Sequence, residues 1–123
     1  MAYLTDRKRV SGLGPAGSGT THHWHQTILS AALVILVPLF LLTFGRVLGA
    51  PWEEVAIYYS RPWPALIALA TLFVGWVHFA KGVRVMIEDY VGGTARKALI
   101  VLTTILSYGA ALASVYALAR LAL

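Results

Sequence analysis

Residues 98–119 read ALIVLTTILSYGAALASVYALA and contain no charged side chain. A helix rises 1.5 Å per residue, so this stretch would extend about 33 Å, enough to cross the hydrocarbon core of a bilayer. Residues 27–45 and residues 62–80 are likewise uncharged. The sequence therefore predicts an all-α integral membrane protein with three transmembrane helices in one domain, residues 1–123. The predicted boundaries of the spans are 27–48, 62–90 and 96–120.

The overall composition supports the same class of protein. Of 123 residues, 59% are hydrophobic and 12% are charged, whereas an average soluble domain has about 25% charged residues. So few charges do not cover the surface of a small soluble domain, which excludes a soluble globular enzyme and a disordered tail. The net charge is +5, but the basic residues form no dense stripe, so a nucleic-acid-binding module is excluded as well. The chain has no cysteine, and therefore no disulfide or thiolate metal site.

The distribution of Lys and Arg predicts which side of the membrane each end occupies. Residues 1–26 and the loop between the second and third spans carry five basic residues, and the other side carries three. By the positive-inside rule, residues 1–26 form a cytoplasmic N-terminal segment and the C-terminus is periplasmic. The aromatic residues that fit the interfacial belts are Trp52, Tyr58, Tyr59 and Trp63 outside, and Trp24 and Tyr90 inside.

Proline and glycine mark the ends of the predicted helices. Pro62 and Pro64 open the second span, where a missing amide donor costs little, and the pair Gly92-Gly93 closes it. Pro38 lies inside the first span and is expected to kink it. Residues 11–21 are rich in Gly and Ser and are expected to form a loop before the membrane.

His78 is the most central ionisable residue of the second span. At about 100° per residue, Thr71, Gly75, Gly82 and Asp89 lie on the same side of this helix as His78. Small residues one turn above and below the histidine leave room for something bulky, either another helix or a flat macrocycle. Two interpretations follow. His78 hydrogen-bonds to a neighbouring helix, or it is an axial ligand of a haem iron whose second ligand comes from another chain.

Further polar residues are each open to two interpretations. Lys81 either snorkels to the interface or pairs with an anion inside the assembly, such as a haem propionate. Asp89 and Tyr90 form either a solvated helix end or a polar pair beside a hydrophobic pocket. In that pair the tyrosine hydroxyl would donate to a carbonyl ligand and the aspartate would pass protons from water. The three histidines within residues 22–25 (His22, His23 and His25) are expected to form an interfacial polar collar, since no carboxylate or cysteine beside them completes a metal site.

The run His78-Phe-Ala-Lys-Gly82-Val-Arg-Val-Met-Ile-Glu-Asp89-Tyr90 resembles the signature of the hydrophobic membrane-anchor family of succinate dehydrogenase, in its bacterial and mitochondrial-like form that contains cytochrome b. That family has a histidine in the second span, a glycine four residues later and Asp-Tyr eleven and twelve residues later, and all of these match. The segment 12–26, with His23-Trp24 and Gln26, resembles the family's motif before the first span. The resemblance covers nearly the whole chain.

The resemblance implies a place in a respiratory complex of the bacterial cell inner membrane. His78 would be one axial ligand of a haem b, and a partner anchor of the cytochrome b556 type would supply the other. Tyr90 would hydrogen-bond a ubiquinone carbonyl, Asp89 would support Tyr90 and the proton path, and Lys81 could reach a haem propionate. The flavoprotein and iron–sulfur subunits would oxidise succinate. Close relatives commonly carry Arg where this chain has Thr27, so a contact made by that Arg does not carry over.

Two other classes of function stay open. In the first, the chain is a non-redox membrane scaffold or assembly protein in which His78 and the glycines only pack helices. In the second, it is a stand-alone membrane cytochrome b, in which two copies donate His78 to one haem. The sequence contains no Ser/His/Asp set, Gly-rich phosphate loop or paired mid-chain carboxylates. The chain by itself is therefore expected to catalyse nothing, and the resemblance implies that it acts as one subunit of a succinate:quinone oxidoreductase.

Overall fold

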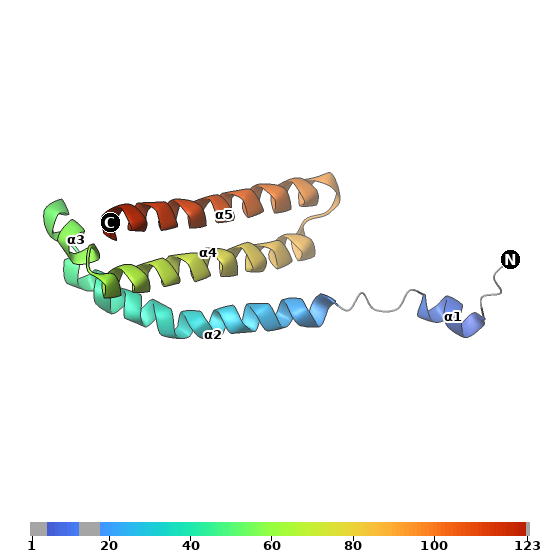
Figure 1. Ribbon diagram of the computed structural model, residues 1–123. Coiled ribbons are helices and arrows are strands. Elements are labelled where there is room, and N and C mark those ends of the chain that lie inside the picture. The colour runs from blue at the N-terminus through green and yellow to red at the C-terminus, as the bar shows by residue number, and fades with distance from the viewer. Residues whose placement is uncertain (1–4, 13–17, 123) are drawn as a thin grey trace.

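The computed structural model describes residues 5–12 and 18–122, which are helical apart from short connections (Figure 1). The elements in chain order are α1 (Asp6–Ser11), α2 (Ser18–Phe44), the 3-10 turn η1 (Gly45–Val47), α3 (Trp52–Tyr59), α4 (Pro62–Tyr90) and α5 (Gly93–Ala122). Among the described residues, three helical segments are long and apolar enough to cross a membrane: Gly19–Val47, Pro62–Tyr90 and Gly93–Ala122. The predicted all-α membrane class and its three spans are confirmed.

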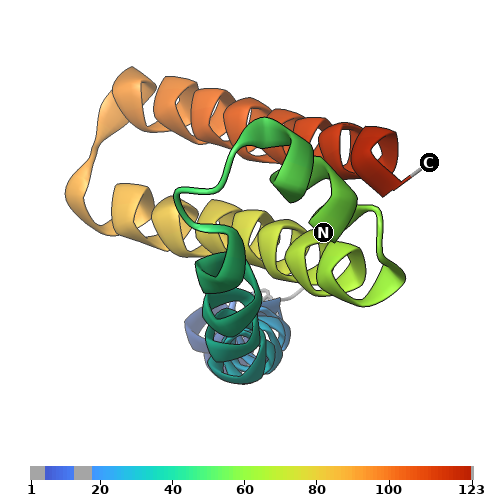
Figure 2. The ribbon, with the colours of Figure 1, turned by 90° about the vertical axis from the view of Figure 1, so that its left-hand side faces the viewer.

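The middle of the three long helices is α4. It packs against α2 and against α5, and within the described residues α2 and α5 do not contact each other. Figure 2 shows α2 nearly end-on where α4 and α5 are seen from the side, so α2 crosses α4 obliquely. The start of α2, the end of α4 and the start of α5 lie at one end of the protein, and α3 and the C-terminus lie at the other (Figure 1).

The bounds of α4 match the second predicted span at both ends. Pro62 is the first residue of the helix and Arg61 before it is extended, so the missing amide proton interrupts no helical hydrogen bond. At the other end Val91 is extended and Gly93 has a φ of +65°, a left-handed conformation that glycine adopts without strain. The turn into α5 therefore uses the glycine pair that the sequence indicated.

The first and third helices extend beyond their predicted spans. The first begins at Ser18 and not at residue 27, so residues 18–21 are helical and not part of a loop, while residues 13–17 of that predicted loop lie outside the described residues. The third extends past both ends of 96–120. Hydropathy marks where a chain enters hydrocarbon, whereas a helix continues into water as long as its polar residues tolerate helical backbone.

The helix α2 bends along its length, and Pro38 lies inside it (Figure 1). Proline has no amide proton to donate to the preceding turn, which agrees with the predicted kink. On α4, the buried Thr71 hydroxyl donates to the carbonyl oxygen of Ile67 at 2.7 Å and also lies 3.3 Å from the carbonyl oxygen of Leu36 on α2. This polar contact joins the two helices close to the bend.

The buried core of the single chain is small and lies at the α3 end. It consists of Val47, Tyr59, Ala68 and Leu118, contributed by η1, α3, α4 and α5. Burial, and secondly the neighbouring Tyr58, raise the pKa of the Tyr59 hydroxyl, so Tyr59 stays protonated at neutral pH. The sequence analysis did not predict α3. Its signal is the pair of acidic residues in its first turn, where carboxylates interact favourably with the helix dipole.

We expect Tyr59→Ala to loosen the packing of α3 on α4 and α5. Truncating a buried aromatic side chain costs about 3 kcal/mol, because the cavity left behind closes only in part. The thermal unfolding midpoint of the chain in detergent micelles should fall, whereas Tyr59→Phe, which keeps the ring, should unfold near the original temperature. Equal midpoints for the Ala and Phe variants would show that this ring does not hold the core together.

Candidate functional site

His78 is half-buried and lies where α4 meets α2. Gln26 of α2 reaches it across the seam between the helices. Gln26 Nε2 lies 3.5 Å from His78 Nε2 and donates to the His78 carbonyl oxygen at 3.5 Å. Both distances are long, since N–H···O bonds cluster near about 2.9–3.0 Å. The contact with a neighbouring helix that one interpretation of His78 predicts is therefore present, but it is weak.

Two buried polar atoms in this contact have no hydrogen-bond partner. They are His78 Nδ1 and Gln26 Oε1, and no other side-chain nitrogen or oxygen in the described part of the chain is both buried and unpartnered. An unsatisfied buried polar atom costs about 1–3 kcal/mol, and hydrocarbon offers no water to relieve that cost. The chain alone therefore does not satisfy the His78 imidazole.

An apolar hollow of about 260 Å³ opens beside the imidazole. His78, Phe79, Gly82, Val83 and Met86 line it, and all of them belong to α4. The described residues thus supply one helical wall to this hollow. The imidazole and the apolar lining of the hollow fit the chemistry of one side of a haem.

The two glycines predicted to flank His78 differ in what surrounds them. A Cβ built on Gly82 would lie 3.3 Å from Gln26 Nε2, which is tighter than most such contacts. A Cβ built on Gly75 would meet nothing within 4 Å. The space predicted beside His78 is therefore taken by α2 at Gly82 and is open at Gly75.

Lys81, Asp89 and Tyr90 lie between His78 and the end of α4 that is shared with the start of α2. Lys81 is half-buried, at about 60° around the helix from His78. Asp89 and Tyr90 are exposed, Tyr90 at 85%, and neither side chain has a hydrogen bond or an ion pair with the described residues. Within the described residues, the side chains of Asp89 and Tyr90 thus form an exposed helix end.

A polar groove runs along the seam between the start of α2 and the end of α4, and the sequence analysis did not predict it. Two adjoining hollows of about 380 and 360 Å³ form the groove, lined by Gly19, His22, His23, Gln26, Gly82, Arg84, Val85 and Glu88. Arg84 Nε donates to Glu88 Oε1 at 2.8 Å, which pairs the two charges one turn apart on α4. Gln26 lines this groove and also contacts His78, so the groove adjoins the contact between α2 and α4 at His78.

Part of the predicted histidine collar lies in this groove. His22 and His23 line it, and the exposed His25 is not among the lining residues. Within residues 5–12 and 18–122, no three His, Asp or Glu side chains gather as a metal-ion site. Gln26 was noted in the sequence only as part of the motif before the first span. The sequence feature that could have pointed to Gln26 is its position, since it is a polar residue directly before the uncharged run 27–45. In the structure, α2 begins before this position.

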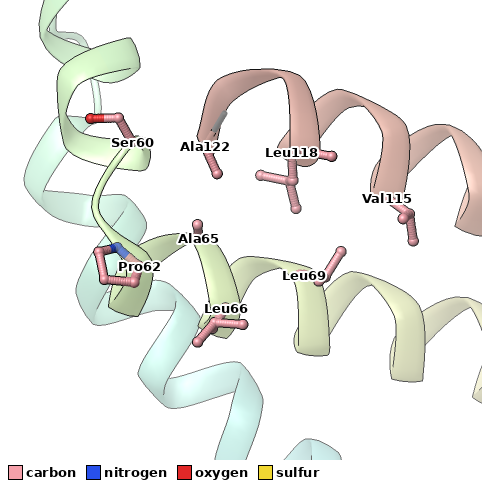
Figure 3. A pocket seen from close by; sticks show the side chains of 9 residues that line it. Ser60, Pro62, Ala65, Leu66, Leu69, Val115, Leu118 and Ala122 are labelled. Carbon is pink, nitrogen blue, oxygen red and sulfur yellow. The ribbon is translucent and has the colours of Figure 1, made fainter.

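A separate apolar cavity of about 440 Å³ lies at the opposite end, between the start of α4 and the end of α5 (Figure 3). The side chains that line it include Ala65, Leu66 and Leu69 of α4 and Val115 and Leu118 of α5. No titratable side chain lines this cavity. It therefore offers apolar contact without the chemistry that His78 and the polar groove provide.

Comparison with known proteins gives two consistent matches. Residues 1–116 match the family model described as "Succinate dehydrogenase/Fumarate reductase transmembrane subunit". The chain is 46% identical over 123 residues to a protein of Paracoccus denitrificans named succinate dehydrogenase hydrophobic membrane anchor subunit. The aligned region covers 100% of this chain and 95% of that protein. No solved structure matches.

The two glycines of α4 provide a matched test of the seam. Gly82→Ala should shift the Gln26 carboxamide by a few tenths of an ångström and so stabilise the chain in detergent micelles less than Gly75→Ala does, because its Cβ would lie 3.3 Å from Gln26 Nε2. Gly75→Ala should be neutral or stabilising by up to about 1 kcal/mol, because alanine has the higher helix propensity and its Cβ meets no atom. Thermal unfolding followed by circular dichroism measures both changes. A similar midpoint for the two variants would contradict the close approach at Gly82.

Proposed function

The chain belongs to the succinate dehydrogenase/fumarate reductase transmembrane subunit family, and we propose that it binds one side of a haem b and forms part of the ubiquinone site of succinate dehydrogenase. It is a membrane-anchor subunit, and it is a multi-pass protein of the bacterial inner membrane. It serves an enzyme complex as an anchor and associates with the catalytic subunits of that complex.

The identity of the individual partners is part of the proposal. A flavoprotein subunit oxidises succinate, an iron–sulfur subunit receives the electrons, and a second anchor of the cytochrome b556 type packs against this chain. Large apolar side chains supply the surface for that packing and for lipid contact, among them Val34 at 73% exposed on α2 and Leu112 at 70% on α5. The N-terminus lies in the cytoplasm, which places the start of α2 and the end of α4 beside the catalytic subunits.

His78 is the observation that carries the haem proposal. Its Nδ1 is buried without a partner, and the apolar hollow beside it lacks a second wall. Iron coordination satisfies an imidazole nitrogen that is otherwise costly to bury in hydrocarbon. A bound haem b can accept and give up one electron. Lys81, half-buried one turn from His78, places an ammonium group where it can pair with a propionate.

Tyr90 and Asp89 carry the quinone part of the proposal. They lie at the exposed end of α4, about 16 Å along the helix from His78. The Tyr90 hydroxyl donates to a quinone carbonyl oxygen and so stabilises the charge that develops there as electrons arrive. Asp89, in contact with water, passes protons towards the same oxygen. Two electrons from succinate and two protons from the cytoplasm convert ubiquinone to ubiquinol.

A reduced-minus-oxidised spectrum of the purified complex tests the haem ligand. In His78→Ala the haem b signal should be lost, because one axial ligand is missing. In His25→Ala, a matched change of an exposed histidine, the signal should be kept. Retained haem in His78→Ala would exclude the proposed ligand. Haem bound by the chain without any partner would instead support the homodimeric cytochrome, and haem in no context would support the scaffold.

The quinone role is tested by separating two activities of the assembled complex. Tyr90→Phe removes a hydroxyl and nothing else, so ubiquinone reduction should fall by about tenfold or more. Succinate oxidation with an artificial soluble acceptor should be unchanged, because the catalytic subunits remain intact. Tyr108→Phe, an equivalent change on an exposed tyrosine of α5, is the control. Loss of both activities would indicate misassembly, and full quinone reduction would exclude Tyr90 from the site.

A further inference from the structure

Gln26 has a contact pattern that the proposed function does not use. Its Nε2 lies 3.5 Å from both the ring Nε2 and the backbone carbonyl oxygen of His78. Its Oε1 is buried without a partner, as is His78 Nδ1. Within the described residues, every buried side-chain nitrogen or oxygen without a partner thus belongs to Gln26 or His78, which contact each other from α2 and α4.

Contact with both ends of His78 restrains the orientation of the imidazole. Because the Gln26 side chain touches both the backbone carbonyl and the ring of His78, it opposes rotation of the ring about the side-chain bonds of His78. A carboxamide suits this position, because it carries donors and an acceptor and can pair with a ring nitrogen whether or not that nitrogen bears a proton. It also adds no charge beside the half-buried His78.

The backbone of Gln26 is part of α2, and the space for its side chain depends on the absence of a side chain on α4. The Gln26 carbonyl oxygen accepts a hydrogen bond from the Ser30 hydroxyl at 2.9 Å, within α2. Across the seam, a Cβ on Gly82 would lie 3.3 Å from Gln26 Nε2, so glycine leaves the space that the carboxamide occupies. The neighbouring Thr27 differs, since its hydroxyl donates at 3.0 Å to the His23 carbonyl of the same helix and its side chain is exposed.

We propose that Gln26 is a positioning residue for His78, holding the imidazole across the α2–α4 seam in the orientation in which it serves as a haem ligand. The inference rests on the proposed function, because it concerns the imidazole as an axial ligand. Mutating a residue that orients a metal-binding histidine typically lowers the metal affinity by about 10- to 100-fold. Gln26 acts in this way through His78 and does not itself touch the iron.

The experiment compares Gln26→Leu, Gln26→Glu, Thr27→Val and His78→Ala in the assembled complex. Leucine keeps the approximate size of glutamine and removes its polar atoms, while glutamate restores an acceptor. Three properties are measured: the rate of haem transfer to excess apomyoglobin, the midpoint potential of the haem, and the ferric low-spin EPR signal. The g-values of that signal depend on the orientation of the axial ring planes, which a purely structural role would leave unchanged.

We expect Gln26→Leu to lose haem about tenfold faster or more and to shift both the g-values and the potential. Gln26→Glu should restore the g-values in part, and Thr27→Val should match the unchanged complex. Unaltered g-values and potential in Gln26→Leu, with haem lost in His78→Ala, would overturn this inference alone. A reduced yield of complex with an unaltered signal would also overturn it, because Gln26 would then only support folding. Haem retained in His78→Ala would overturn the proposed function and the inference with it.

Discussion

Hydrocarbon provides no water for buried polar atoms, and His78 is where this constraint acts most strongly on the chain. One imidazole nitrogen has no partner, and the other has only a long contact with Gln26. A protein that needed His78 for helix packing alone would gain more from a short hydrogen bond or from an apolar side chain at this position. The proposed haem would complete this arrangement, in a chain that belongs to the succinate dehydrogenase/fumarate reductase transmembrane subunit family.

The central position of α4 explains how one helix takes part in several interactions. It packs against α2 and against α5, which do not contact each other in the described residues. Thr71 and Gly82 meet α2, while the apolar hollow beside His78 is lined by α4 alone. A helix held by two neighbours would be a rigid support for the proposed haem ligand, and its open side would be available to the proposed second anchor.

The two ends of the molecule differ in chemistry. At the end where α2 starts, the polar groove contains His22, Arg84 and Glu88, and the exposed Asp89 and Tyr90 follow. At the other end, α3 covers an apolar core around Tyr59, and a second cavity is lined without titratable groups. The residues of the proposed haem and quinone sites thus lie apart from the apolar core at the α3 end.

The sequence by itself determined the membrane class, the three spans, the bounds of α4 and the kink at Pro38, because hydropathy and the backbone properties of Pro and Gly act locally. It also identified His78, since an ionisable residue is conspicuous in an apolar span. It did not predict that α2 starts at Ser18, that α3 forms, or that Gln26 lies against His78 while Gly75 stays open. Those features depend on how α2 crosses α4, which brings together residues 52 positions apart. Helical periodicity specifies which residues share a face, and only the packing of two helices decides which of them meet.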